Sequence, residues 1–399
     1  MNDVQHYLRP GTLQLPALPP LSLYLHLPWC LKKCPYCDFN SHERRAGVDA
    51  RAQQARYVDA LLADLEASLP LVWGRPVYSV FIGGGTPSLF EPEQIDRLIA
   101  GARARLPLEP MCEITLEANP GTFERERFAA FRAAGVTRLS VGVQSFHDRH
   151  LKALGRVHDG AQARAALEEA ARAFDTFNLD LMYALPGQTL AELEQDVRTA
   201  LAFAPPHLSI YHLTIEPNTV FAKFPPRLPD DDTAWDMLDR ITALTADAGL
   251  ARYEVSAYAR AGHRCVHNLN YWEFGDYLGI GAGAHGKLTL GAQQQVLRRW
   301  KVKHPSEYLL KAGTASAIGG DEVLSTERLP FDFMLNALRL NQGVPMAMFE
   351  ARTGLPRAAI AAQVAIARER GWLDADEDWL RPTELGRRFA NAAIGLFLD

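Results

Sequence analysis

Cysteine is scarce in this chain, which has five among its 399 residues. A small secreted domain held together by disulfides has proportionally far more. Three of the five cysteines also lie within one stretch of eight residues, which is not the spacing of a disulfide framework. The sequence therefore favours a reducing compartment, the cytoplasm.

Long apolar runs and an excess of basic charge are also missing. No stretch approaches the about 18 consecutive apolar residues that cross a bilayer as a helix. The first twenty residues lack the basic segment and apolar core that mark a secretory signal. Lysine and arginine total 42 against 47 for aspartate and glutamate, so no overall positive field attracts nucleic acid. We expect a cytoplasmic protein without a transmembrane segment and without a nucleic-acid partner.

Short apolar runs alternate with amphipathic segments of helical period through the first part of the chain. The runs are rich in Val, Ile, Leu and Tyr, and Gly and Pro lie in the connections. Six such units in succession predict a parallel sheet covered by helices, either an open doubly wound sheet or a partial (β/α) barrel. We expect strands at residues 22–27, 77–83, 113–118, 138–144, 178–185 and 207–215.

Polar residues and glycines gather at the carboxyl ends of five consecutive expected strands. Ligands bind at these ends in open α/β sheets and in (β/α) barrels alike. One polar strand end means little, but five in succession indicate a single site. The residues are 83–87 after the second strand, then Glu117 with Asn119, Gln144 with Ser145, Asp180, and Tyr211 with His212.

The pattern divides the chain into four parts. Residues 1–20 contain several prolines and predict an extended leader, and residues 21–250 carry the β–α units. Residues 251–300 form a connecting segment with the motifs HNLNYW and GIGAGAHG. Residues 301–399 predict helix, helix, hairpin and helix, an order that resembles a winged helix, with the hairpin turn at 374–378. The arginines there are scattered, so we expect a structural or partner-binding role rather than DNA binding.

The clustered cysteines, Cys30, Cys34 and Cys37, follow the first expected strand with the spacing C-x3-C-x2-C. Thiolates favour iron–sulfur clusters, copper(I) or zinc. Three of them can hold three irons of a [4Fe–4S] cluster and leave the fourth iron open. That iron can bind the amine and carboxylate of an amino acid, which S-adenosylmethionine (SAM) has. A zinc site with a distant fourth ligand, such as His42 or Cys265, is the alternative.

The surroundings of these cysteines resemble the radical SAM superfamily. Its signature has the same spacing with an aromatic residue before the last cysteine, the position of Tyr36. The stretch GGGTP, one strand downstream, looks like the glycine motif through which that superfamily receives the methionine amine of SAM. The resemblance implies an α/β fold in which a partial (β/α)6 TIM-like barrel, the radical SAM core, precedes the C-terminal winged-helix-like α+β domain. It also implies a [4Fe–4S] cluster and SAM as cofactors.

Within the superfamily, roughly residues 20 to 390 are similar to the oxygen-independent coproporphyrinogen III oxidase subfamily, and most of all to its branch of haem chaperones. The oxidases have a fourth cysteine two residues after the third, where this chain has Phe39, and a longer N-terminal extension. The HNLNYW stretch is typical of the chaperone branch. The resemblance rests on YLHLPWC, CPYCDFNSH, GGGTPS, LEANP, GVQSF, LGR, LDLMYALPGQ, HNLNYW and GIGAGAHG.

This resemblance implies a haem chaperone that binds haem as its cargo and delivers it to apo-haemoproteins, among them respiratory proteins at the inner membrane surface. Two alternatives stay open. One is oxidative decarboxylation of the propionates of coproporphyrinogen III by a 5′-deoxyadenosyl radical, against which Phe39 argues. The other is a radical SAM enzyme that acts on a different substrate. The sequence assigns no residue a catalytic role.

The resemblance also implies which residues meet SAM. The glycine loop presents backbone donors and acceptors, and Glu117 accepts hydrogen bonds from the amine or the ribose. Gln144, Arg156 and Asp180 match positions that contact a second SAM in the oxidase; whether a second SAM binds here is open. The alternatives are that Tyr24 is a half-buried strand tyrosine and that Glu117 forms an ordinary salt bridge. For Gln144, Arg156 and Asp180 the alternative is that they line the cavity without contacting a ligand. The full set is Tyr24, Tyr36, Gly84, Gly85, Thr86, Glu117, Gln144, Arg156 and Asp180.

Haem requires an axial ligand and an apolar pocket. Among twelve histidines, His267 in HNLNYW is the first candidate, because Tyr271 and Trp272 beside it can stack on a porphyrin. A structural polar turn at His267 and Asn268 is the alternative. His285 in GAGAHG is the second candidate.

Overall fold

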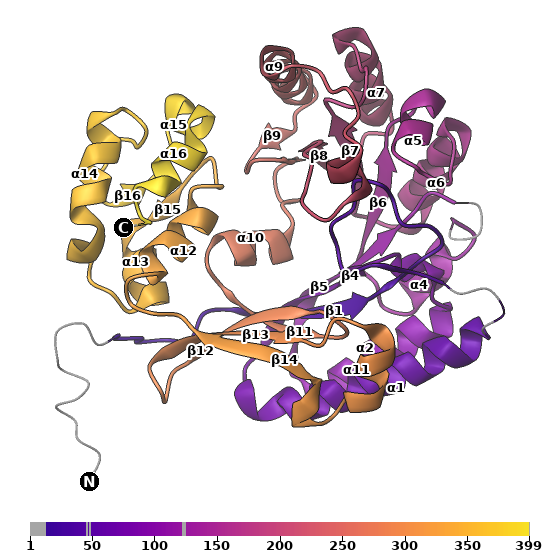
Figure 1. Ribbon diagram of the computed structural model, residues 1–399, viewed down its shortest axis with the longest axis horizontal. Coiled ribbons are helices and arrows are strands. Elements are labelled where there is room, and N and C mark those ends of the chain that lie inside the picture. Colours follow the sequence, from indigo (N-terminus) through magenta and orange to yellow (C-terminus); the bar gives the residue numbers. More distant parts are fainter. Residues whose placement is uncertain (1–12, 45–46, 48, 122–124, 399) are drawn as a thin grey trace.

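The computed structural model describes residues 13–44, 47, 49–121 and 125–398. The largest feature of these residues is a curved twelve-stranded sheet with the order β14-β13-β12-β11-β1-β4-β5-β6-β7-β8-β10-β9 (Figure 1). Within the described chain, six neighbouring strands are parallel and form the partial (β/α)6 barrel that the sequence predicts. They are β1 (Leu21–Leu27), β4 (Val77–Gly84), β5 (Leu108–Ala118), β6 (Arg138–Gln144), β7 (Phe177–Tyr183) and β8 (His207–His212).

Helices cover the outer face of the parallel strands (Figure 1). Several begin at a side chain that caps the first turn. Asp159 and Thr189 each accept a hydrogen bond from the third helical residue, whose side chain bonds back to the cap. The apolar faces of helices and strands then share one core. The helices are α1 (Ala50–Ser68), α2 (Pro92–Arg105), α4 (Phe128–Ala133), α5 (Asp148–Ala153), α6 (Gly160–Ala173), α7 (Leu190–Ala202) and α9 (Asp231–Asp247). The short α8 (Val220–Lys223) instead packs beside the loop after β1, where Phe221 N donates to Pro35 O over 3.0 Å.

After α9 the chain extends the sheet at both edges. Two short antiparallel strands continue it beyond β8, and α10 then packs against β1, β4 and β11. At the other edge β11 pairs in parallel with β1, and an antiparallel meander follows it. The buried Asp276 anchors this edge through Lys287 Nζ and Arg75 Nη2, each 2.9 Å from a carboxylate oxygen. The elements are β9 (Ala251–Arg252), β10 (Ala257–Ala259), α10 (Val266–Trp272), β11 (Asp276–Ile280), β12 (His285–Leu290), β13 (Gln295–Lys301), α11 (Pro305–Lys311) and β14 (Ile318–Val323).

The C-terminal helices form a second apolar core beside the barrel (Figure 1). A hairpin follows α14: Leu373 pairs with Pro382, and Asp374 N donates to Arg381 O over 2.9 Å. With a helix after it, this is the winged-helix-like order that the sequence predicts. Among the described residues, no helix is both long and apolar enough to span a bilayer. The elements are α12 (Leu329–Ala337), β15 (Val344–Pro345), α13 (Met346–Thr353), α14 (Ala361–Glu369), β16 (Trp379–Leu380), α15 (Glu384–Arg388) and α16 (Ala390–Gly395).

One of the expected domain limits differs from where the sheet ends. The sheet continues to the end of β14, so a limit at residue 301 falls inside the meander. Residues 1–12 of the expected leader lie outside the described residues. Leu13 and Leu15 are buried against the C-terminal core, where Gln14 N donates to Gly354 O over 2.9 Å. The four-part division of the chain stays a prediction.

Candidate functional site

The three cysteines lie on the loop between β1 and α1. Two short strands, β2 (Trp29–Cys30) and β3 (His42–Glu43), pair in parallel at the base of the loop. All three thiols are free and partly exposed. Each faces a polar group: Thr86 Oγ1 lies 3.6 Å from Cys30 Sγ, Arg156 Nη1 3.7 Å from Cys34 Sγ, and Ser41 Oγ 3.6 Å from Cys37 Sγ.

The glycine motif after β4 packs directly against the cysteine loop. A Cβ on Gly85 would lie 2.7 Å from Pro28 C and from Trp29 O, so only glycine fits there. Gly85 N donates to Leu27 O and Thr86 N to Trp29 O, each over 2.8 Å. Gly84 N donates to Glu117 Oε2 over 3.0 Å. The N–H groups of Gly84, Gly85 and Thr86 are thus bonded within the chain, and Thr86 O also accepts from Leu89 N over 3.0 Å. That these backbone groups meet SAM stays a prediction.

Arg156 joins the cysteine loop to the ends of two strands. Besides facing Cys34, it donates through Nη2 to Asn119 Oδ1 over 2.5 Å and to Gly142 O over 2.7 Å. The side chain of Gln144 also lies beside Gly142, because a Cβ on Gly142 would be 3.0 Å from Gln144 Nε2. Asn119 Nδ2 in turn donates to Thr86 Oγ1 over 3.0 Å. Asn119 is thus a central polar group, although the sequence showed it only as a polar strand end within the LEANP motif.

Two carboxyl groups lie inside the barrel. Burial, together with the charge of the nearby Asp180, raises the pKa of Glu117 to about 7 against the hydrogen bond from Gly84. Burial raises the pKa of Asp180 to about 6, although Asn178 Nδ2 and Ser140 Oγ donate to it over 2.6 and 3.1 Å. Two carboxyl groups that protonate near neutral pH can accept from, or donate to, a polar ligand.

The two tyrosines of the expected site face different surroundings. Tyr24 Oη lies 2.8 Å from His26 Nδ1, and its ring packs on Phe81 with centroids 5.5 Å apart. Tyr36 packs beside Phe221, with centroids 6.4 Å apart, in a small apolar cluster away from the main core. Tyr24 therefore reaches the interior of the barrel, whereas Tyr36 supports the cysteine loop.

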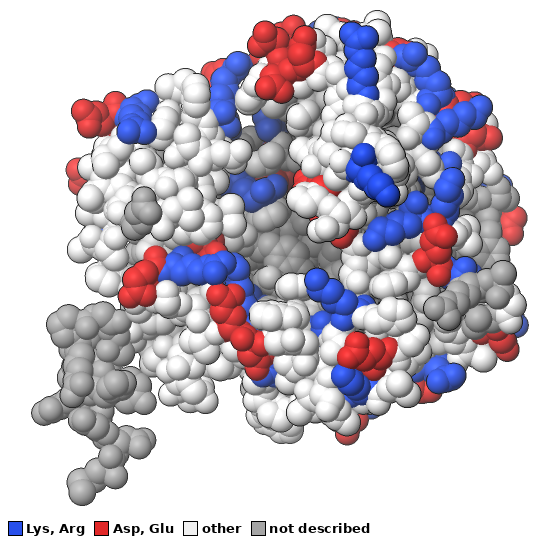
Figure 2. Space-filling view, viewed as in Figure 1, with Lys and Arg blue, Asp and Glu red and all other residues white. Residues whose placement is uncertain are grey.

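A cavity of about 810 Å³ opens at the mouth of the barrel. Figure 2 shows the molecule hollowed there, between the C-terminal helices and the barrel. Tyr24, Cys37, Gly84 and Glu117 line it together with α10, so the fold brings these four expected site residues to one space. Among the described residues, Gln144, Arg156 and Asp180 do not line this cavity and lie around the hydrogen-bond network behind it.

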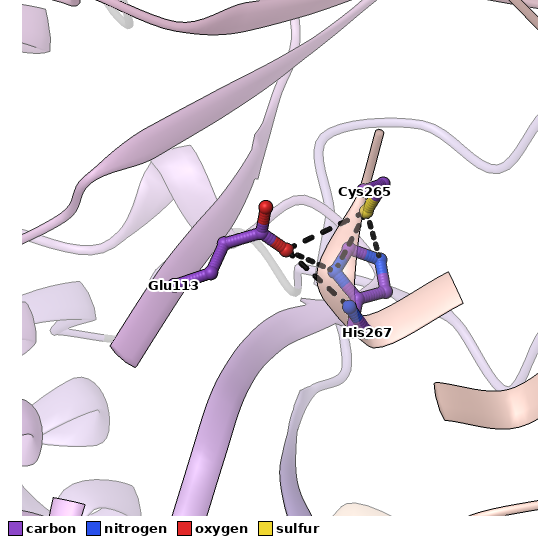
Figure 3. Close-up of side chains that lie close together, drawn as sticks. All are labelled: Glu113, Cys265 and His267. Atoms are coloured by element: carbon purple, nitrogen blue, oxygen red, sulfur yellow. Dashed lines mark hydrogen bonds and ion pairs between the residues drawn. The ribbon is translucent and has the colours of Figure 1, made fainter. Parts of the chain in front are cut away.

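His267, the expected haem ligand, is buried on α10 (Figure 3). Its ring stacks on Phe81 with centroids 4.3 Å apart and planes at 9°. Nδ1 lies 3.2 Å from Glu113 Oε1, and Nε2 lies 3.5 Å from Cys265 Sγ. Because both nitrogens face protein groups, iron reaches them only if α10 moves. The geometry supports a structural role, and the role of haem ligand stays a prediction.

Glu113 of β5 binds the start of α10 and also Arg138, and no sequence motif indicated this role. Its Oε1 accepts from Val266 N over 3.1 Å at the start of α10, and its Oε2 lies 3.6 Å from Arg138 Nη1. Burial opposes ionisation, but the hydrogen bond from His267 and the charge of Arg138 outweigh it and lower the pKa of Glu113 to about 2. By donor type, Glu113, Cys265 and His267 could hold a metal ion, yet the carboxylate is already saturated by protein donors.

The distant ligands of the zinc alternative lie elsewhere. Cys265 contacts Glu113 and His267, and His42 faces His304 with ring centroids 5.5 Å apart. Among the described residues, neither makes a hydrogen bond with any of the three clustered thiols. The loop therefore offers a set of three thiols without a fourth protein ligand beside them.

Comparison with protein families matches the Radical SAM superfamily over residues 24–200 and the HemN C-terminal domain over residues 324–389. The first range spans the cysteine loop and strands β1 to β7 of the barrel. The second spans most of the C-terminal helices.

Individual proteins match over nearly the whole chain. Heme chaperone HemW of Escherichia coli (strain K12) is 47% identical over 382 residues, which are 96% of this chain and 99% of that protein. Heme chaperone HemW of Haemophilus influenzae is 46% identical over 385 residues with the same coverage. Among solved structures, the radical SAM enzyme coproporphyrinogen III oxidase (HemN) from Escherichia coli superposes with a TM-score of 0.78 at 25% identity, covering 95% of this chain and 90% of that one.

Proposed function

Because the chain belongs to the radical SAM family whose members are named heme chaperone HemW, we propose that it binds haem and delivers it to apo-haemoproteins. The observation that carries this proposal is an identity of 46% and 47% to two proteins of that name over 96% of the chain. The aligned residues include the barrel, α10 and the C-terminal helices. Respiratory proteins at the membrane surface are the recipients that we propose.

A [4Fe–4S] cluster and SAM are implied by the family, and the residues present fit both. Cys30, Cys34 and Cys37 provide three free thiols, the ligands that such a cluster prefers. Gly85 lets the glycine loop approach them without a side chain. When bound, the cluster supplies the electron that can cleave the sulfonium of SAM. We propose that Tyr24 and the backbone and carboxylate groups around the cavity orient SAM.

Iron and sulfide analysis of the anaerobically reconstituted protein tests the cluster ligands. We expect Cys34→Ala to lose most of the bound iron, because two thiols hold a cluster poorly. The matched control is Cys112→Ala, which removes a buried thiol of β5 far along the chain from the loop. Equal iron in both variants would exclude Cys34 as a ligand.

The superposition on coproporphyrinogen III oxidase favours one second candidate, oxidation of a porphyrinogen in the same cavity. Phe39 occupies the position of the oxidase's fourth cysteine and is 64% exposed at the cavity. Incubation with coproporphyrinogen III under strict anaerobiosis separates the two functions. The chaperone proposal predicts no decarboxylated product, and release of 5′-deoxyadenosine without a porphyrin product would indicate a different substrate.

Titration of the reconstituted protein with haemin, followed in the Soret band, tests the proposed function directly. We expect a saturable shift at one haemin per chain, followed by transfer to an added apo-haemoprotein. Absence of specific binding would contradict the proposal. The cavity at the barrel mouth would then be interpreted as the active site of an enzyme with an unidentified substrate.

A further inference from the structure

A second cavity lies between the barrel and the C-terminal helices. It has a volume of about 950 Å³ and is lined by β7, β8, α9 and β9 on one side and by α12, α15 and α16 on the other. We call it the interdomain groove. Figure 2 shows a cleft between these two parts of the molecule, with blue side chains along and inside it. The interdomain groove and the barrel-mouth cavity share Leu335, so they lie on two sides of α12.

One histidine, His212, faces the interdomain groove from the carboxyl end of β8. Its ring stacks on Tyr183, with centroids 5.0 Å apart and planes at 28°. Its ring nitrogens make no hydrogen bond with any described residue, in contrast to those of His267 and His26. A ring held by stacking with free nitrogens can bind an iron without first losing a protein partner.

Three arginines of the interdomain groove have no carboxylate within ion-pair distance among the described residues: Arg252, Arg339 and Arg387. Arg252 and Arg387 donate to backbone carbonyl groups. Arg339 lies over Trp272, and its buried Nε has no hydrogen-bond partner. Burial and repulsion from Arg252 lower the pKa of Arg387, against the charge of Glu384. Asp239 and Glu384 of the groove pair with Arg388 instead, so the three arginines keep no direct carboxylate partner.

The walls of the interdomain groove carry apolar and aromatic side chains between the charged ones. Trp235 on α9 is 38% exposed and Phe389 between α15 and α16 is 51% exposed, and both line the groove. Leu335 and Leu338 of α12 line the wall of the C-terminal part. Exposed aromatic side chains on both walls of a cleft favour a flat apolar ligand.

We propose that the interdomain groove is the haem site of this protein, with His212 as the axial ligand of the iron. The porphyrin packs between Trp235 and Phe389, and its two propionates face the unpaired arginines. This inference rests on the proposed function and adds the place where the cargo is held. It combines three features that suit haem: an imidazole with a free nitrogen, aromatic and apolar side chains on both walls, and cationic partners for two carboxylates.

The barrel-mouth cavity fits the same cargo less well. Its buried Lys287 pairs with Asp276 over 2.9 Å and its Arg298 pairs with Asp332 over 3.2 Å, so these two cations are already neutralised. Lys33 and Lys303 also line it and form no ion pair among the described residues, so the space left beside the cysteines is what decides. The cavity also borders Cys37, where the proposed cluster and SAM take up space. A haem in the interdomain groove leaves that space free, so cofactors and cargo can be bound at the same time.

The first test is a haemin titration of the full-length reconstituted protein and of its His212→Ala variant. We expect the variant to bind haemin at least about tenfold more weakly and to lose the spectrum of a histidine ligand. The matched control is His263→Ala, on a loop outside both cavities, which should bind as the unchanged protein does. Circular dichroism and the cluster absorbance confirm that each variant is folded and loaded.

The second test uses haemin dimethyl ester, in which the propionates are blocked. The unchanged protein should prefer haemin over the ester by about tenfold or more, and Arg387→Gln should lose most of that preference. The test compares the affinities of one and the same protein for the two ligands. A general loss of stability would weaken both affinities and would leave their ratio unchanged.

The outcomes separate this inference from the proposed function. If the unchanged protein binds no haemin, the proposed function fails and the site fails with it. If it binds haemin and His212→Ala binds with the same affinity and spectrum, the interdomain groove is not the site, while the proposed function stands. Equal affinity for haemin and its dimethyl ester would overturn the role of the arginines.

Discussion

The ring of His267 lies flat against the ring of Phe81, with 4.3 Å between the centroids and 9° between the planes. This contact joins α10 to β4 inside the barrel. His267 is also the residue that the HNLNYW motif predicts as a haem ligand. The same histidine also meets Glu113 of β5, so it holds two strands and a helix together.

His267→Ala should therefore lower the free energy of unfolding by about 2–4 kcal/mol, because it removes a buried ring and one of the partners of the buried Glu113. Urea unfolding of the apo-protein measures this loss. The control is His285→Ala at an exposed position, which should change stability by less than about 0.5 kcal/mol. A His267→Ala variant of unchanged stability but weakened haemin binding would restore His267 as the ligand.

Glu113→Gln should remove part of the acid sensitivity of the fold. The folded pKa of Glu113, about 2, lies below its ordinary value of 4.5. Its contribution is therefore complete above about pH 4.5 and is lost as the pH falls toward 2. At pH 7 we expect the variant to be less stable by about 2–4 kcal/mol, because Arg138 stays buried without its partner.

Between pH 4.5 and 2.5 the difference between Glu113→Gln and the unchanged protein should shrink. Unfolding curves at several pH values measure it, with Glu369→Gln on the exposed face of α14 as the control. A difference that does not vary with pH would mean that Glu113 is not ionised in the folded state.

Glu117→Gln should have the opposite pH dependence. The folded pKa of Glu117, about 7, lies above its ordinary value of 4.5. Its favourable contribution is complete below about pH 4.5 and is lost as the pH rises through 7. At pH 8 the variant of the apo-protein should be more stable by about 2 kcal/mol, because an uncharged amide avoids the cost of a buried carboxylate.

At pH 4 the stability of Glu117→Gln should equal that of the unchanged protein. Thermal unfolding at the two pH values is the measurement, and Glu377→Gln in the exposed hairpin turn is the control. A variant that is less stable at pH 8 would show that the bond from Gly84 outweighs burial.

Gly85→Ala should loosen the cysteine loop. The added Cβ would lie 2.7 Å from backbone atoms of Pro28 and Trp29, which cannot move without displacing the loop. We expect a loss of about 1–3 kcal/mol in the free energy of unfolding and a lower iron content after reconstitution. Gly395→Ala in α16 is the control, because nothing lies within 4 Å of its Cβ. Normal iron content in Gly85→Ala would show that the loop tolerates this displacement.

Part of this protein follows from the sequence without reference to its folded shape. Hydrophobic periodicity and the caps at Asp159 and Thr189 are local, so they determine the alternation of strands and helices. The spacing of Cys30, Cys34 and Cys37 is local as well. The resemblance to radical SAM proteins could thus be stated from short motifs, and the barrel confirms the fold that it implied.

Tertiary structure decided which side chains meet. Asn119 and Arg156 lie 37 residues apart, and Glu113 and His267 lie 154 apart, so no local pattern reveals either pair. His212 looked like one polar strand end among five until the C-terminal part of the chain placed Arg339 and Arg387 in the same groove, beside Arg252 of β9. Motifs determine backbone and chemistry over a few residues. Burial and pairing depend on the approach of distant segments, and these decide whether a histidine such as His267 or His212 is free to bind a ligand.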